Sequence, residues 1–111
     1  MKELALKFPV LDLAKGFSAY RSENYSVALS EWEPLAREGN AVAAFSLGMM
    51  YYKGQGVKKD YAVAVSWYTL AAKKGNEFGQ YNLGWMYESG NGVGQDYKIA
   101  AKWYLLAAEQ G

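Results

Sequence analysis

The sequence predicts an all-α protein, an α-solenoid of about six antiparallel helices in three stacked helix-turn-helix repeats. Two observations support this prediction. The 111-residue chain contains one 36-residue pattern twice in succession without a gap. Each copy also has glycines where helices would end, followed by Asn or Asp where the next helix would begin. Because one helix pair cannot cover its own apolar side, repeats of this period stack into a single domain.

The composition restricts the chemistry of the chain. It contains no Cys and no His, the residues behind disulfides, thiol nucleophiles, most zinc sites and titration near neutral pH. Twelve Lys plus Arg against 11 Asp plus Glu give a net charge of +1, which provides no broad field for nucleic acid or an anionic membrane. Without a nucleophile, a base or a ligand cluster, we expect no enzyme, no metal site and no cofactor.

The amino-terminal segment, residues 1–9, reads MKELALKFP. It is too short and too interrupted by charge for a signal peptide or a membrane span. As written, the sequence favours a cytoplasmic location. A periplasmic or secreted location would follow if a signal peptide had been removed.

The first repeat unit, residues 10–39, is shorter than the other two. Its Ala28 aligns with Ala64 and Ala100 of the later units, so its second helix keeps the common register. Gly16 precedes Ala28 by 12 residues, whereas the corresponding separation in both later units is 16. We therefore expect the first unit to lack a four-residue extension of the loop between its helices.

The second and third units, residues 40–75 and 76–111, are identical at 17 of their 36 positions. Gly39 and Gly75 suit the left-handed residue after a helix end, and the Asn that follows each suits a helix N-cap. A Gly-x-Gly-Val loop divides each unit, and the next Asp can cap the second helix. The predicted helices span residues 41–53, 60–74, 77–89 and 96–110.

Glycine recurs in the middle of each first helix, at Gly48 and Gly84. Glycine in a helix interior costs about 1 kcal/mol relative to alanine, so a packing reason should offset this penalty. The small residues Ala64 and Ala100 on the second helices are the predicted partners, since small residues on both helices allow a close approach.

At this point the second unit resembles a Sel-1-like repeat. The residues that carry the resemblance are Leu47-Gly48-x-Met50-Tyr51-x-x-Gly54-x-Gly56-Val57-x-x-Asp60-Tyr61-x-x-Ala64-x-x-Trp67-Tyr68-x-x-Ala71-Ala72-x-x-Gly75. Residues 83–111 repeat this pattern, and the first unit instead resembles a tetratricopeptide repeat. The resemblance implies a scaffold that assembles partners in secretion, quality control, signalling or host interaction.

The first helix of each unit carries two apolar stripes at helical spacing, so one stripe is left after the other packs inside the unit. In tetratricopeptide-like solenoids the positions of the second stripe face the concave groove, and the resemblance extends that face into the first unit. The predicted partner-binding groove consists of Phe17, Tyr20, Val42, Phe45, Met49, Tyr52, Phe78, Tyr81 and Trp85.

Met49 and Trp85 are the strongest candidates within this groove. They follow the helix glycine, at a position where the two repeats differ, and exposed Met and Trp suit adaptable protein binding. For Phe45 and Tyr81 the alternative is that neighbouring first helices cover them. Arg21 and Lys53 stand at the groove edge, where they would bind a carboxylate or remain solvated surface charges.

The tryptophans and tyrosines of the second helices occur in both full repeats, which predicts a core role. These residues are Trp67, Tyr68, Trp103 and Tyr104. The sequence closes with the third unit, where no polar helix follows to cover Leu106 and Ala107. A longer array or a homo-oligomer would cover this end.

The expected function is that of a protein-protein interaction adaptor or scaffold. Its partner would be a peptide or protein segment bound in the aromatic concave groove. The alternative is a structural, self-assembling module in which the apolar stripe and the uncapped carboxyl-terminal end are buried between copies.

Overall fold

The computed structural model describes residues 13–111. These residues form six helices: α2 (Leu13–Arg21), α3 (Tyr25–Arg37), α4 (Ala41–Lys53), α5 (Tyr61–Lys73), α6 (Glu77–Ser89) and α7 (Tyr97–Gln110). No strand occurs within residues 13–111, so the predicted all-α class is confirmed. The segment 1–9 and the start of the first unit lie outside the described residues.

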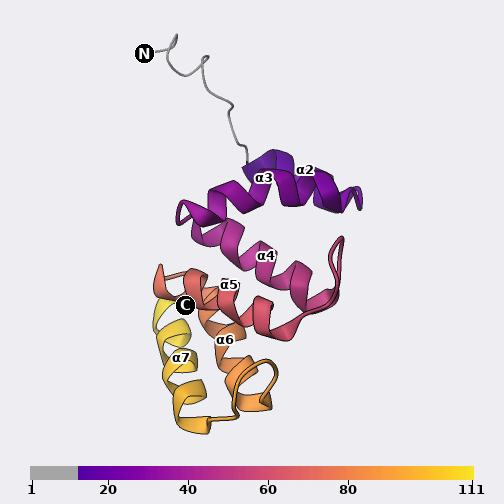
Figure 1. Ribbon diagram of the computed structural model, residues 1–111. Coiled ribbons are helices and arrows are strands. Elements are labelled where there is room, and N and C mark those ends of the chain that lie inside the picture. The colour runs from indigo at the N-terminus through magenta and orange to yellow at the C-terminus, as the bar shows by residue number, and fades with distance from the viewer. Residues whose placement is uncertain (1–12) are drawn as a thin grey trace.

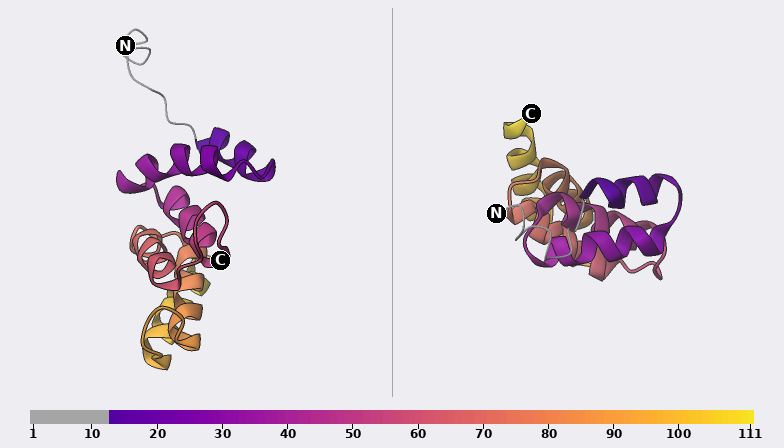
Figure 2. Two further views of the ribbon diagram at one scale, coloured as in Figure 1. Left: turned by 45° about the vertical axis from the view of Figure 1, so that its right-hand side comes forward. Right: turned by 90° about the horizontal axis from the view of Figure 1, so that it is seen from above.

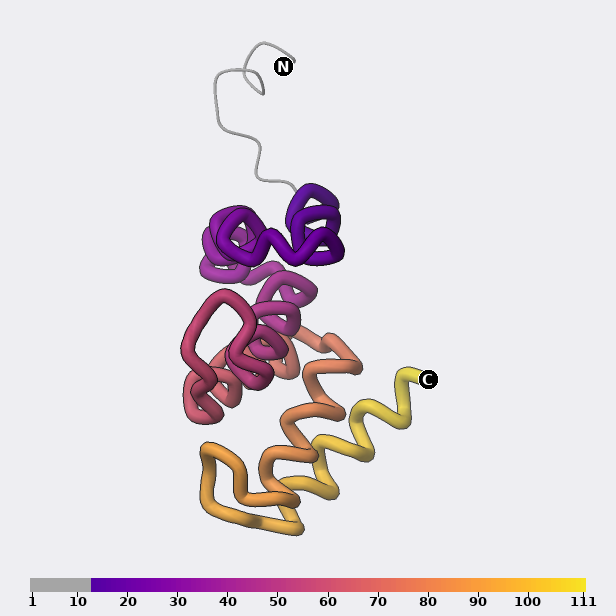
Figure 3. Tube along the Cα trace, turned by 90° about the vertical axis from the view of Figure 1, so that its right-hand side faces the viewer, coloured from indigo at the N-terminus to yellow at the C-terminus, as the bar shows by residue number. Residues whose placement is uncertain are grey.

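The six helices form three antiparallel pairs, and the pairs follow one another along the stack (Figure 1). Within the pairs, α2 packs on α3, α4 on α5 and α6 on α7, and successive pairs meet through α3 with α4 and α5 with α6. The stack measures 50 × 30 × 20 Å. Each pair is rotated relative to the previous one, as the views in Figure 2 and the Cα trace in Figure 3 show.

The helix boundaries follow from local capping interactions. Asn40 and Asn76 accept hydrogen bonds from the backbone N–H groups of Ala43 and Gly79, at 2.9 and 2.8 Å. The predicted helices 41–53 and 77–89 are confirmed at both ends. Asp60 and Asp96 are N-caps, so α5 and α7 begin one residue later than predicted.

The mid-helix glycines lie under aromatic rings that the sequence prediction did not name. A Cβ placed on Gly48 would lie 2.5 Å from Cδ1 of Tyr68, and one placed on Gly84 would lie 2.9 Å from the same atom of Tyr104. The ring projects from the residue four positions after the expected alanine, one turn along the same face of the second helix. The predicted approach to the alanine is present at Gly84, where the Cβ would lie 3.2 Å from the Ala100 carbonyl oxygen, whereas the three atoms nearest to Gly48 all belong to Tyr68.

The second glycine of each Gly-x-Gly loop joins neighbouring units. Gly56 adopts φ +72° and a Cβ there would lie 2.5 Å from Cβ of Tyr25, the first residue of α3. Gly92, at φ +74°, approaches the backbone of Tyr61, the first residue of α5, in the same way. The left-handed conformation and the close contact both require glycine at these two positions.

Two clusters of buried side chains form the core. The first lies between α3 and α4 and includes the fully buried Trp32, Leu47 and Met50. The second lies between α5 and α6 and includes Tyr68 and Met86. The predicted core role of Tyr68 is confirmed, while the other three aromatic residues assigned to the core are half-buried: Trp67, Trp103 and Tyr104.

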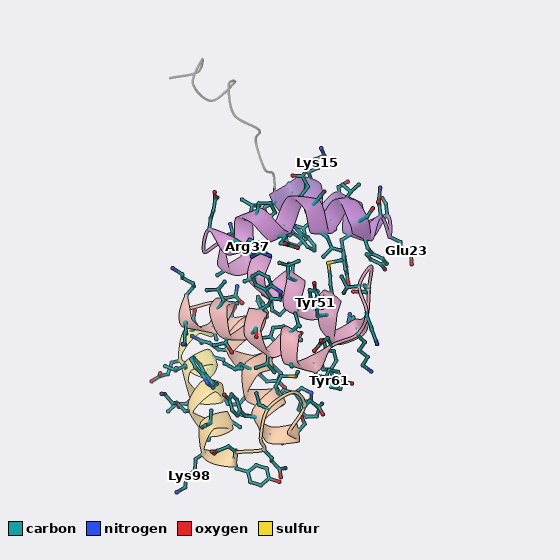
Figure 4. All side chains as sticks on the ribbon, in the orientation of Figure 1. Lys15, Glu23, Arg37, Tyr51, Tyr61 and Lys98 are labelled. Atoms are coloured by element: carbon teal, nitrogen blue, oxygen red, sulfur yellow. The ribbon has the colours of Figure 1, made fainter. Side chains whose placement is uncertain are left out.

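Most charged side chains are exposed on the outside of the stack. Lys15 and Lys98 point away from the helices in Figure 4, Arg37 is exposed, and Tyr51 packs against the second core cluster. Lys15 forms an ion pair with Glu31 at 3.3 Å. Of the helices within residues 13–111, none has both the length and the apolar character needed to cross a membrane.

Candidate functional site

A groove of about 320 Å³ lies on the side of the stack where the first helices of the two full units meet. We call it the α4–α6 groove. It brings together five of the residues predicted from sequence, four from the apolar stripe and one from the charged edge. Its lining consists of Met49, Tyr52, Lys53, Tyr68, Tyr81, Asn82, Trp85 and Met86.

Helical spacing places these side chains around one depression. Met49, Tyr52 and Lys53 occupy positions i, i+3 and i+4 on α4, and therefore share one face of that helix. Tyr81 and Trp85 stand four residues apart on α6, so they too share a face. The floor consists of side chains that are buried in the second core cluster, which fixes its position.

The walls of the groove are open to solvent. The Trp85 side chain is 44% exposed and that of Tyr81 is 59% exposed, whereas Met86 is fully buried beneath them. Large apolar side chains exposed together around a concave surface are typical of protein interaction sites. Lys53 adds a positive charge at the edge of this otherwise apolar lining.

Two predicted groove residues of the first unit pack inside the protein instead. The rings of Phe17 and Tyr20 lie 5.0 and 5.8 Å from that of Trp32. The Tyr20 hydroxyl donates a hydrogen bond of 2.9 Å to Oε1 of Gln55, in the loop of the next unit. Both aromatic residues thus stabilise the first unit and its junction, and Arg21 is exposed without lining the groove.

The remaining predicted residues divide between core and surface. Phe45 contacts both core clusters, with its ring 6.0 Å from Tyr68 and 5.8 Å from Phe78. Phe45 is therefore covered by a neighbouring first helix, as the alternative interpretation of the sequence expected. Val42 and Phe78 are exposed, but neither lines the α4–α6 groove.

Asn82 and Tyr68 line the groove although the apolar stripe did not include them. Asn82 follows Tyr81 on α6, and the same position of the previous unit is Ser46. Burial raises the pKa of the Tyr68 hydroxyl to about 12, against a smaller opposing effect of its hydrogen bond with Asn82. The groove thus contains an amide beside a buried hydroxyl. The only hint in the sequence that this position is polar was Ser46, the equivalent residue of the previous unit.

The raised pKa of Tyr68 predicts a loss of stability at alkaline pH. Because the folded pKa of about 12 exceeds the ordinary value of 10.0, the unfolded chain loses the proton first. The contribution of Tyr68 to the free energy of unfolding is complete below pH 10 and falls between about pH 10 and 12, by on the order of 2 kcal/mol.

Urea denaturation at a series of pH values tests this expectation. Tyr68→Phe should flatten the fall in unfolding free energy over that interval, relative to the parent chain. Tyr97→Phe is the matched control, because the Tyr97 side chain is exposed and removing its hydroxyl should leave the slope unchanged. Equal slopes for the parent and Tyr68→Phe would contradict the prediction.

The repeat sequence shows how this chain is related to known proteins. The sequence model of the Sel1 repeat matches residues 41–76 and residues 78–111, which together make up more than half of the chain. The chain belongs to the Sel1 repeat family. The α4–α6 groove is therefore built between two matched Sel1 units. None of the curated protein sequences matches this chain significantly.

Two crystal structures of Sel1 repeat proteins share the fold. A Sel1 repeat protein from Oxalobacter formigenes superimposes with a TM-score of 0.85 at 35% identity, over 89% of this chain and 41% of its own. The c5321 protein, described as a protective antigen of uropathogenic Escherichia coli strains with an SLR fold, gives 0.81 at 39% identity. That match covers 88% of this chain and 22% of c5321, so this chain spans less than half the length of either protein.

Acidic side chains do not offer an additional site. Across residues 13–111, Asp and Glu are nowhere grouped in threes that would hold a metal ion. The lining of the groove is mainly apolar and aromatic, and its polar groups are one lysine, one carboxamide and the tyrosine hydroxyls.

Proposed function

We propose that the Sel1 chain binds a peptide or protein segment in the α4–α6 groove. Sel1 repeats generally act as protein-protein interaction modules and non-enzymatic scaffolds. The observation that carries this proposal is the meeting of Met49 and Trp85 in one groove. These two residues occupy equivalent positions and differ between the repeats; Met49 is half-buried, and Trp85 is exposed beside Tyr81.

The lining specifies the kind of segment that would fit. An apolar side chain of the partner would enter between Met49 and Trp85, where it displaces water from apolar surface. An acidic side chain next to it would reach Lys53, and the carboxamide of Asn82 would hydrogen-bond to the peptide backbone. A net charge of +1 provides no attraction for nucleic acid, so we propose a protein partner without a cofactor.

Selection from a phage-displayed library of random peptides tests the proposal. We expect enriched peptides with a large apolar residue next to Asp or Glu. Trp85→Ala and Met49→Ala should each weaken the selected peptides by about tenfold or more, because each removes one wall of the groove. Thermal melting should stay close to that of the parent, since neither residue belongs to a core cluster.

Leu105→Ala is the matched control for these variants. It removes a 61% exposed apolar side chain of α7 that does not line the groove, so peptide affinity should be unchanged. Selected peptides that bind all three variants equally would contradict the proposal. If Trp85→Ala instead converts an oligomer into a soluble monomer without affecting peptide binding, the self-assembling alternative gains support.

A further inference from the structure

Charge is unevenly distributed among the three repeat units. The middle unit, residues 40–75, contains five lysines and a single acidic residue. The first unit, residues 10–39, contains three basic and five acidic residues, and the third, residues 76–111, contains two and four. Positive charge is therefore concentrated between two negative flanks, a local field that the net charge of +1 conceals.

Three of the lysines stand beside the α4–α6 groove. Lys53 is the last residue of α4 and lines the groove, and Lys58 and Lys59 belong to the loop that follows. A Cβ placed on Gly54 would lie 3.1 Å from Cβ of Lys59, so this loop returns beside the end of α4. We call Lys53, Lys58 and Lys59 the basic edge.

Aromatic rings connect the basic edge to the groove. Nζ of Lys59 lies 4.9 Å from the ring centroid of Tyr61, a cation–π contact at the end of the helix pair that Figure 4 labels. The Tyr61 ring lies 5.1 Å from that of Tyr52, which lines the groove. A segment that leaves the groove past Tyr52 therefore reaches Lys59 along a continuous surface of rings.

The fold does not use the charges of the basic edge. All three lysines are exposed, and none of the ion pairs within residues 13–111 involves them. The acidic residue of this unit, Asp60, is the N-cap of α5 and accepts a hydrogen bond of 3.1 Å from the Val63 N–H group. The three ammonium groups are therefore accessible to a ligand.

The third unit shows that the repeat forms without these lysines. Its side-chain amide of Gln95 donates hydrogen bonds of 2.9 Å to the Glu88 carbonyl and the Tyr97 hydroxyl, and so closes the loop without a charge. Gly54 and Gly90 have nearly the same φ, +72° and +75°, so the two loops begin alike. The residues equivalent to Lys53, Lys58 and Lys59 are Ser89, Gly94 and Gln95.

We propose that the basic edge extends the α4–α6 groove into a site for a short acidic protein segment, whose apolar side chain fills the groove and whose Asp or Glu residues continue past Tyr52 to Lys59. This inference rests on the proposed binding of a peptide in the groove. The acidic residues would lie on the α4 side, because the α6 side has the exposed Glu88 at the position equivalent to Tyr52.

The negative flanks favour a short acidic segment over a long polyanion. A nucleic acid would extend from the middle unit over neighbouring units in which acidic residues outnumber basic ones. A peptide with a few acidic residues would remain within the middle unit. Charge complementarity therefore points to a protein partner.

Labelled peptides with blocked ends that join one tryptophan to three glutamates are the probes, in both orders. Each has a counterpart in which glutamine replaces every glutamate. In fluorescence anisotropy with the full chain at about 50 mM salt, the better acidic peptide should bind about fivefold or more tightly than its glutamine counterpart. This advantage should largely disappear at about 500 mM salt, because salt screens exposed charges.

Paired lysine variants then locate the charge that matters. Lys53→Ser combined with Lys59→Gln introduces the residues of the third unit, and acidic and glutamine peptides should bind this variant alike. Lys73→Ser combined with Lys74→Gln is the matched control. It removes the same charge from the same unit, but at the other end of α5, so the advantage of the acidic peptide should persist.

The outcomes separate this inference from the proposed function. Equal affinity of the parent chain for acidic and glutamine peptides would overturn the inference alone, provided that Trp85→Ala weakens both. An equal loss of the advantage in the two lysine pairs would also overturn it, since the attraction would not depend on the basic edge. Absence of saturable binding by every peptide, or binding that Trp85→Ala leaves unchanged, would contradict the proposed function itself. Displacement of the acidic peptide by a similar concentration of oligothymidylate would overturn the choice of a protein partner.

Discussion

Gly48→Leu should lower the free energy of unfolding by about 3 kcal/mol or more, enough to unfold much of a small domain at room temperature. The reason is steric. The first side-chain carbon would already lie 2.5 Å from the ring of Tyr68, a residue that is only 2% exposed and belongs to the second core cluster. Circular dichroism during urea denaturation measures the loss, and a parent-like midpoint would contradict it.

Gly48→Ala separates this packing effect from helix propensity. Alanine in a helix interior is favoured over glycine by about 1 kcal/mol, so propensity alone predicts stabilisation. We expect a net loss of about 1 to 2 kcal/mol instead, since a Cβ at 2.5 Å would force the Tyr68 ring out of its packed position in the second core cluster. Gly84→Ala is the matched control, because its clash with Tyr104 is milder, at 2.9 Å, and that ring is only half-buried.

The helices could be predicted from sequence because their ends are decided locally. Asn40 and Asn76 cap α4 and α6 with their own side chains, and Gly54 and Gly90 end these helices in the left-handed conformation. No distant contact is needed for either effect. The 36-residue period then determined that the helices pair and stack, because each pair leaves an apolar side to cover.

The aromatic ring over each helix glycine could not be predicted in this way. Ala64 and Tyr68 stand one turn apart on the same face of α5, so helical periodicity does not distinguish them. Small residues facing one another predicted a close backbone approach, which Gly84 makes to the Ala100 carbonyl, but not that the glycine also accommodates a large ring. In the first unit an aromatic ring likewise lies over the helix glycine, because Trp32 packs over Gly16. This unit has Glu-Trp where the other units have Trp-Tyr.

The structure brings predicted residues of the two full units together in one groove and places those of the first unit elsewhere. Met49 and Trp85 belong to two full units whose first helices lie side by side, so equivalent positions meet. The short first unit has a larger core residue, Trp32, which contacts Phe17 and Tyr20 and draws both inward. Helical position alone does not show how large the neighbouring core residue is, so the sequence did not indicate that Phe17 and Tyr20 pack on Trp32.

Trp32→Ala should cost about 3 to 5 kcal/mol, the largest loss expected from a single truncation in this chain. The indole is fully buried, packs over Gly16, and donates a hydrogen bond of 3.2 Å from Nε1 to the Leu13 carbonyl. Removing it would leave α2 with few contacts to α3. Amide exchange within residues 13–21 should therefore approach that of an unfolded chain, while α6 and α7 retain protection.

Trp32→Tyr provides the matched comparison, because tyrosine occupies the equivalent place over Gly48 and Gly84. It keeps an aromatic ring above Gly16 but loses the indole hydrogen bond, so we expect a loss of about 1 to 2 kcal/mol. If Trp32→Ala and Trp32→Tyr destabilised the chain equally, the hydrogen bond to Leu13 would dominate over packing. The ring-over-glycine contact would then not be what holds the first unit to the stack.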